Sequence, residues 1–145
     1  MPWTRWITPR VPSVMRKRFD TRFFLAQLPE GLEAKHDEHE ATETVWLRPR
    51  EALERYWRRD IEMAPPQIQS LAHLARHSRA ADVIAEAMER RPPLIEPEPF
   101  EEEGTRVIAY PGDPRHPVAA RAMPGPLRLR HVKGRFEPFG GFEAL

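Results

Sequence analysis

The stretch RFDTRFFLAQLPEGLEAKHDEHEATETVWLRPREAL, residues 18–53, decides the fold because it predicts a strand, a turn, an acidic loop, a second strand and a helix in quick succession. Aromatic and β-branched side chains recur along residues 19–26, as is typical of a strand, and Pro29 and Gly31 then end it. The apolar run at 45–47 predicts the second strand. Six carboxylates and two histidines separate the two strands, so charge is concentrated beside a predicted sheet edge.

Prolines mark the limits of the other predicted elements. Residues 1–17 contain three prolines, so we expect an extended segment that drapes over the core with its two tryptophans as anchors. Pro49 suits the first position of a helix, and the proline pair at 65–66 opens a second one. Ser78 either caps a third helix or lies within a continuous one. The proline pair at 92–93 ends this helical region.

The remainder of the chain predicts β structure. Residues 94–105 are acidic and proline-rich, which is the composition of a linker. Residues 106–110 predict a short strand, and 127–132 together with 135–136 predict a small antiparallel hairpin. Short helices and antiparallel strands together favour the α+β fold class.

Composition excludes several classes of function. The chain of 145 residues has no cysteine, so it has no disulfide, thiolate nucleophile or cysteine-ligated metal. Its net charge of +1 gives no global attraction to nucleic acid or to a membrane surface. Basic residues at 16–18 and 128–135, each near a phenylalanine, leave nucleic-acid binding as the least favoured class. Without an apolar signal segment or an 18-residue apolar run, we expect a cytoplasmic protein that does not enter a membrane.

The acidic loop is the candidate place for a metal. Glu40 and Glu43 offer two hard oxygen ligands if the loop folds back on the sheet, although a solvated acidic surface explains the same residues. His36 and His39 lack a third nitrogen or sulfur ligand, so they do not predict a zinc site.

Four segments carry a resemblance to a known family: PWTRWITP at 2–9, RFDTRFFLA at 18–26, HDEHEATETVWLRPREAL at 36–53, and the proline pair at 65–66. In this order and spacing they resemble the C-terminal half of Nudix hydrolases, in particular the coenzyme A diphosphatase branch. The resemblance implies part of an α/β/α sandwich. Residues 1–93 would be the C-terminal portion of that domain, 94–105 a linker and 106–145 a C-terminal β extension.

The resemblance also implies a chemistry. Nudix hydrolases cleave a diphosphate linked to another group, using Mg²⁺ or Mn²⁺ held by glutamates of a helix with the motif G-x5-E-x7-R-E-U-x-E-E-x-G-U. This sequence lacks that box: its nearest match, EEEG at 101–104, follows Pro97 and Pro99, which a helix interior does not tolerate. In the family the box precedes the RWITP segment. We therefore expect the isolated chain to be inactive and to hold the metal weakly, with the box upstream or on another chain.

Individual roles follow from the same resemblance. Glu40 and Glu43 would supply an auxiliary base, with Glu40 as an additional metal ligand, and Arg18 and Arg22 would face the substrate phosphates. A solvated strand face that pairs with the acidic loop is the alternative for both arginines. The alternative function is a non-catalytic binding or oligomerisation module, which uses its exposed sheet edge to pair with itself or with a chain that supplies the N-terminal half.

Overall fold

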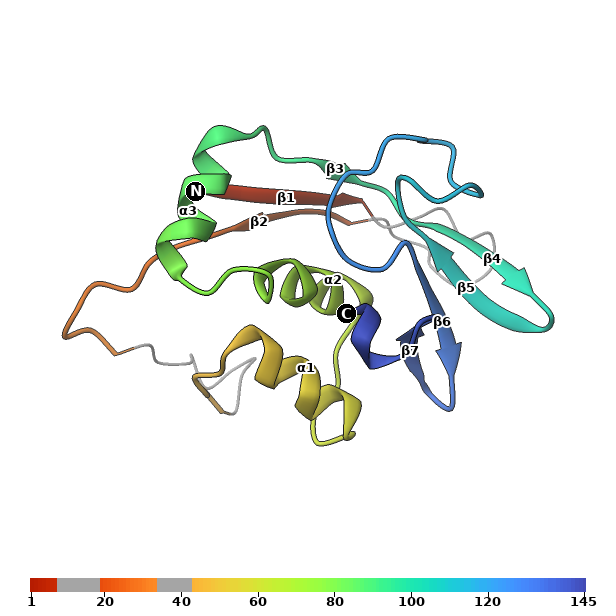
Figure 1. The fold of residues 1–145 in the computed structure, drawn as a ribbon, viewed down its shortest axis with the longest axis horizontal. Helices are drawn as coiled ribbons and strands as arrows, with labels where there is room; N and C mark the ends of the chain where they lie inside the picture. The colour runs from red at the N-terminus through yellow and green to blue at the C-terminus, as the bar shows by residue number, and fades with distance from the viewer. Residues whose placement is uncertain (8–18, 34–42) are drawn as a thin grey trace.

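The computed structural model describes residues 1–7, 19–33 and 43–145, and Figure 1 shows their arrangement. These residues form two β-sheets and three α-helices, which confirms the α+β class. Predictions for residues 8–18 and 34–42 lie outside the described residues. No helix within the described ranges is long and apolar enough to cross a membrane.

The first sheet is built around the N-terminal strand. Its middle strand is β1 (Pro2–Ile7), which pairs antiparallel with β2 (Asp20–Phe24) and parallel with β3 (Leu94–Ile95). The predicted strand at 19–26 is therefore confirmed. The expectation that the N-terminal segment drapes over the core is wrong for β1, because its tryptophans are buried as part of a central strand.

Three helices follow close to their predicted starts. α1 (Pro49–Trp57) and α2 (Pro65–Leu74) each begin at a proline, and α3 (Ala80–Glu89) ends just before the proline pair. Ser78 is neither a cap nor part of a continuous helix, since α3 is a separate helix whose N-cap is Arg79. In Figure 1, α2 lies between the first sheet and α1, and α3 lies beside the start of β1.

The second strand predicted at 45–47 is wrong. These residues form no strand, and Trp46 is 70% exposed. An apolar run makes a strand only when a neighbouring strand and a core surface receive it, and the described residues provide neither here.

A second sheet fills the other end of the molecule (Figure 1). Four antiparallel strands follow one another in chain order: β4 (Glu98–Glu102), β5 (Thr105–Ala109), β6 (Arg128–Val132) and β7 (Arg135–Pro138). A 3-10 turn, η1 (Phe142–Ala144), follows the last strand. The predicted strand and hairpin are confirmed as parts of this larger sheet.

The segment 94–105, which was predicted to be a linker, contains the strands β3 and β4. Ile95 is fully buried, and the guanidinium of Arg115 lies 4.1 Å from the ring centroid of Phe100. The acidic composition does not reveal these strands, because glutamates flank the half-buried Phe100 along β4. The glutamates at 101–102 are strand residues, so the EEEG segment does not form a Nudix box helix. The domain boundaries themselves stay a prediction.

Two clusters of buried side chains form the core. The smaller one, beneath β1 and against α3, consists of Trp3, Val83 and Ala87. The larger one draws on both sheets, the first two helices and the C-terminal residue. Its members are Trp6, Leu53, Tyr56, Ile68, Ala72, Ile95, Ile108, Tyr110, Met123, Leu129 and Leu145. The predicted Nudix-like portion and the predicted C-terminal extension thus share one core.

Polar contacts tie the C-terminal hairpin to the end of α1. The hydroxyl of Tyr56 donates to the carbonyl of Phe136 at 2.6 Å. Nη1 of Arg135 donates to the carbonyls of Tyr56 at 3.1 Å and Trp57 at 2.6 Å. A cation at the C-terminus of a helix satisfies carbonyls that have no partner within the helix and opposes its dipole.

Candidate functional site

The four residues predicted for the Nudix-like site are only partly described. Arg18 and Glu40 lie outside the described residues, so the structure gives them no position. Arg22 is exposed on β2, and Glu43 is exposed in the segment that leads into α1. The roles predicted for these four residues stay predictions.

The strand register places Arg22 on the face of the first sheet that points away from the helices. Arg5 lies directly opposite Arg22, whereas Trp6 lies opposite Thr21 on the core side. The guanidinium of Arg5 binds the carboxylate of Asp20 in a two-point contact of 2.8 and 2.5 Å. This contact lowers the pKa of Asp20, mainly through its hydrogen bonds from Arg5. Among the described residues of β1 and β2, this outer face therefore carries the guanidinium groups of Arg5 and Arg22 and the carboxylate of Asp20.

A cavity of about 330 Å³ lies on this face. Its lining residues come from β1, β2 and the segment before β3: Pro2, Thr4, Arg5, Arg22, Phe23, Phe24 and Pro92. Sequence reasoning singled out Arg22 but missed Arg5. The RWITP segment contains this residue, yet only the antiparallel register between β1 and β2 places it beside Arg22.

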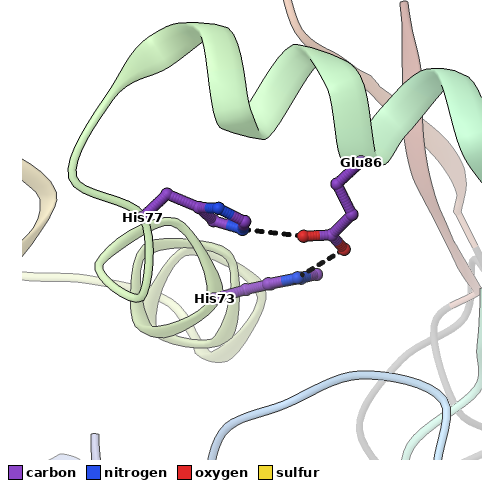
Figure 2. A group of neighbouring side chains, drawn as sticks. All are labelled: His73, His77 and Glu86. Carbon is purple, nitrogen blue, oxygen red and sulfur yellow. Dashed lines mark hydrogen bonds and ion pairs between the residues drawn. The ribbon is translucent and has the colours of Figure 1, made fainter.

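A second cluster, which sequence reasoning missed entirely, joins α2 to α3 (Figure 2). Nε2 of His73 lies 2.9 Å from Oε1 of Glu86, and Nε2 of His77 lies 2.7 Å from Oε2 of the same carboxylate. Figure 2 shows both rings directed toward Glu86, which reaches down from α3. One ligand atom from each residue falls within 4.8 Å of the other two.

The surroundings of this histidine–glutamate cluster are strongly asymmetric. His73 is 3% exposed, and its ring lies 4.4 Å from that of Trp3, centroid to centroid. Burial lowers the pKa of His73 below its ordinary value. The pKa of Glu86 is also lowered: burial works to raise it, but the two histidines and Arg90 outweigh that effect. Nε of Arg90 lies 2.9 Å from Oε1 of Glu86.

The cluster does not fit the metal that Nudix hydrolases use. It is the only group of three or more potential ligands within the described ranges, and it offers two imidazole nitrogens and one carboxylate. Mg²⁺ prefers an octahedral shell of oxygen atoms, and this cluster offers such a shell only one carboxylate.

The sequence held a partial signal for this cluster. His73 and His77 are four residues apart, the spacing that brings two side chains to one side of a helix. The carboxylate comes from another helix, so its approach depends on how α2 and α3 pack.

Comparison with known proteins identifies the class. Residues 1–74 match the family model described as the NUDT19 Nudix domain. That match covers half of the 145 residues, and the chain belongs to this family of Nudix domains. Proteins of the Nudix class generally depend on divalent metal ions.

Three similar curated proteins, from Xenopus laevis, Homo sapiens and Gallus gallus, share one name. The chain is 32% identical over 123 residues to acyl-coenzyme A diphosphatase NUDT19 of Xenopus laevis, a match that covers 79% of this chain and 31% of that protein. It is 33% identical over 100 residues to the Homo sapiens protein of the same name, covering 64% of this chain and 26% of that protein. The chain thus spans about a third or less of these relatives. No solved structure matches it significantly.

Proposed function

We propose that this chain supplies part of a Nudix-type diphosphatase that cleaves a coenzyme A-type or other nucleoside-diphosphate-linked substrate with Mg²⁺ or Mn²⁺. The observation that carries the proposal is the match of residues 1–74 to the NUDT19 Nudix domain, together with relatives named acyl-coenzyme A diphosphatase. In this proposal the box of metal-binding glutamates comes from sequence outside these 145 residues, so the isolated chain is inactive.

The outer face of the first sheet supports a role in holding the substrate. Arg5 and Arg22 line one cavity on that face, and a diphosphate is an anion that guanidinium groups bind through paired hydrogen bonds. We assign Arg22, together with Arg18, to the substrate phosphates. Because Arg5 already binds Asp20, its part is to fix the position of β2 beside the cavity. Glu40 and Glu43 are assigned as auxiliary base candidates, with Glu40 as a metal ligand.

The upstream coding sequence is the first test. The proposal requires an in-frame Nudix box before Met1 or a neighbouring gene that encodes one. If neither exists, the proposal fails.

The second test joins this chain to a polypeptide that bears the box. The 145 residues alone are expected to give no Mg²⁺-dependent hydrolysis of coenzyme A or ADP-ribose. A fusion in which the box-bearing part of the human relative precedes residue 1 is expected to hydrolyse coenzyme A. A fusion that unfolds cooperatively but shows no hydrolysis above background would contradict the proposal.

Variants of the fusion test the role of Arg22. Loss of a charged hydrogen bond costs about 1.5–3 kcal/mol, so Arg22→Ala is expected to lower kcat/KM by about 10- to 100-fold. Arg22→Lys keeps the charge and is expected to lose less. Arg106→Ala removes an exposed arginine from β5 and serves as the matched control. If Arg22→Ala and Arg106→Ala lower kcat/KM equally, the assignment of Arg22 to the substrate phosphates is wrong.

A second candidate function is self-association through the edge strand β2. Phe24 is 65% exposed at the end of this strand, and an exposed apolar edge strand favours pairing with another strand. Size-exclusion chromatography with light scattering tests it over a range of concentrations. A monomer at all concentrations would count against this function.

A further inference from the structure

The histidine–glutamate cluster brings together three side chains that the proposed diphosphatase does not use. His73 belongs to α2, His77 follows directly after that helix, and Glu86 belongs to α3. The carboxylate reaches both imidazoles through the same type of ring nitrogen, Nε2 (Figure 2). Two imidazole nitrogens and one carboxylate oxygen are the protein ligands of one type of zinc site, in which a water completes the tetrahedron.

We propose that His73, His77 and Glu86 form a binding site for one divalent transition-metal ion of the zinc class, which fastens α2 to α3. The ion takes Nε2 of each histidine and Oε2 of the glutamate, and water is the fourth ligand. Nothing in the Nudix resemblance requires this site.

The observed distances allow such an ion after small side-chain movements. Ligand atoms about 2.0–2.1 Å from a tetrahedral zinc ion lie about 3.3 Å from one another. The nitrogen–oxygen distances of 2.9 and 2.7 Å are shorter than this, because each pair shares a hydrogen bond in the absence of a metal. The largest separation within the cluster is at most 4.8 Å. Rotation of the His77 side chain, which is partly exposed, is expected to bring the ligand atoms to the separation that the ion requires.

His77 gives the site a route to solvent. Its side chain is 20% exposed, and it lines a cavity of about 260 Å³ beside the start of α1 and the loop between α2 and α3. This cavity is large enough for water molecules, so an ion has an entry path and a source for its fourth ligand. His73 is buried against Trp3, so its ring is held in place on the other side.

The positive charge of Arg90 disfavours a cation nearby, but Arg90 does not occupy the carboxylate oxygen that the ion would use. It contacts Oε1 of Glu86, whereas Oε2 faces His77. An ion on Oε2 therefore leaves the contact with Arg90 intact, and the guanidinium holds the orientation of the carboxylate.

The donor set makes a prediction about ion selectivity. Imidazole favours Zn²⁺, Cu²⁺, Ni²⁺ and Co²⁺, whereas Mg²⁺ and Ca²⁺ require more oxygen ligands than the cluster offers. Zn²⁺ is therefore expected to bind in a large excess of Mg²⁺.

The experiment uses the 145-residue chain after treatment with a chelator, titrated with ZnCl₂ by calorimetry and with CoCl₂ by visible absorption. The expected result is one ion per chain, a cobalt spectrum with the intense visible bands of four-coordinate geometry, and a rise in Tm that EDTA reverses. Excess MgCl₂ is expected to leave zinc affinity unchanged. Because the readout is binding rather than hydrolysis, failure of the diphosphatase proposal does not affect it.

Variants distinguish the cluster from adventitious binding at surface histidines. His77→Asn and Glu86→Gln replace one ligand each by a side chain of similar size, and each is expected to weaken zinc binding at least tenfold. His131→Ala removes an exposed histidine from β6 and is expected to leave binding unchanged. If the Glu86→Gln variant does not fold, the comparison of zinc binding between His77→Asn and His131→Ala still tests the proposal. Absence of saturable binding in the parent chain, or equal weakening by the His77 and His131 variants, would overturn the proposal.

Discussion

The large core cluster and the outer face of the first sheet place similar side chains in opposite surroundings. In the cluster, Tyr56 and Leu129 are buried where α1 and the second sheet meet, and arginines there are held by carboxylates and carbonyls. On the outer face, Phe24 is exposed, and Arg22 lies beside a cavity. One region is closed by contacts between segments far apart in the sequence, whereas the other is open to solvent.

We therefore expect the closed region to determine the stability of the chain and the open face to be available for binding. The closed region includes side chains of residues 106–145, the predicted C-terminal extension. Ile108, Tyr110 and Leu129 of this segment are therefore part of the core. The open region lies within residues 1–74, the part that matches the Nudix domain. Substitutions in the closed region should lower the free energy of unfolding, and those on the open face should leave it unchanged.

The largest effect is expected for Leu129→Ala in the large cluster. Leu129 is fully buried on β6, and removing a buried leucine side chain costs about 3 kcal/mol. Val83→Ala in the small cluster removes fewer atoms and is expected to cost about 1.5 kcal/mol. Urea denaturation followed by circular dichroism measures both. Equal losses would mean that the large cluster does not dominate stability.

Arg135→Met should cost about 2.5 kcal/mol, because it removes the guanidinium that binds the last carbonyls of α1 and leaves Glu137 without its partner. Arg50→Met is the matched control. Arg50 pairs with exposed carboxylates, so its loss is expected to cost less than about 0.5 kcal/mol. Thermal unfolding of the two variants tests the difference, and a control as destabilised as Arg135→Met would refute it.

Asp113→Asn should cost about 2 kcal/mol at neutral pH, because Arg128 donates to this buried carboxylate at 2.5 and 3.1 Å. Burial works to raise the pKa of Asp113. Hydrogen bonds from Arg128 and from the backbone N–H of Arg115 outweigh burial, so the pKa lies below the ordinary aspartate value of 3.8. The ionised form therefore stabilises the fold above pH 3.8, and this contribution disappears as the pH falls through the folded-state pKa.

Urea denaturation of the parent chain and of Asp113→Asn at neutral pH and at about pH 3 measures this effect. The gap between the two proteins is expected to narrow on acidification. A gap that stays constant would show that the charge of Asp113 is unimportant. Asp60→Asn, which alters a half-exposed pair with Arg58, is expected to have no measurable effect at either pH.

The smallest effect is expected for Phe24→Lys on the outer face. The exposed ring loses few contacts, so the free energy of unfolding should change by less than about 0.5 kcal/mol. Phe23→Ala, on the core side of the same strand beside Trp6, should be clearly more destabilising. A large loss for Phe24→Lys would show that the outer face is covered after all.

Local signals allowed much of the fold to be predicted from the sequence. Prolines placed the starts of α1 and α2 and the end of α3, and side-chain patterns placed β2 and the C-terminal hairpin. Non-local pairing was not accessible. β1 is a central strand only because β2 and β3 flank it, and the acidic β4 is a strand only because β5 receives it.

The same limit applies to the candidate sites. Arg22 was predicted from its strand and from the family resemblance, whereas Arg5 joins it only through the strand register. His73 and His77 show their spacing in the sequence, but Glu86 approaches them only through the packing of two helices. The strand predicted at 45–47 was wrong because the described residues provide no neighbouring strand with which it could pair.

Native-state hydrogen exchange tests most directly whether the two portions share one core. If they do, the slowest amides of α1, α2, β5 and β6 will exchange with one common free energy, equal to that of global unfolding. If the amides of β5 and β6 exchange at a clearly lower free energy while those of α1 stay protected, the C-terminal portion is an independent extension and the shared core is contradicted.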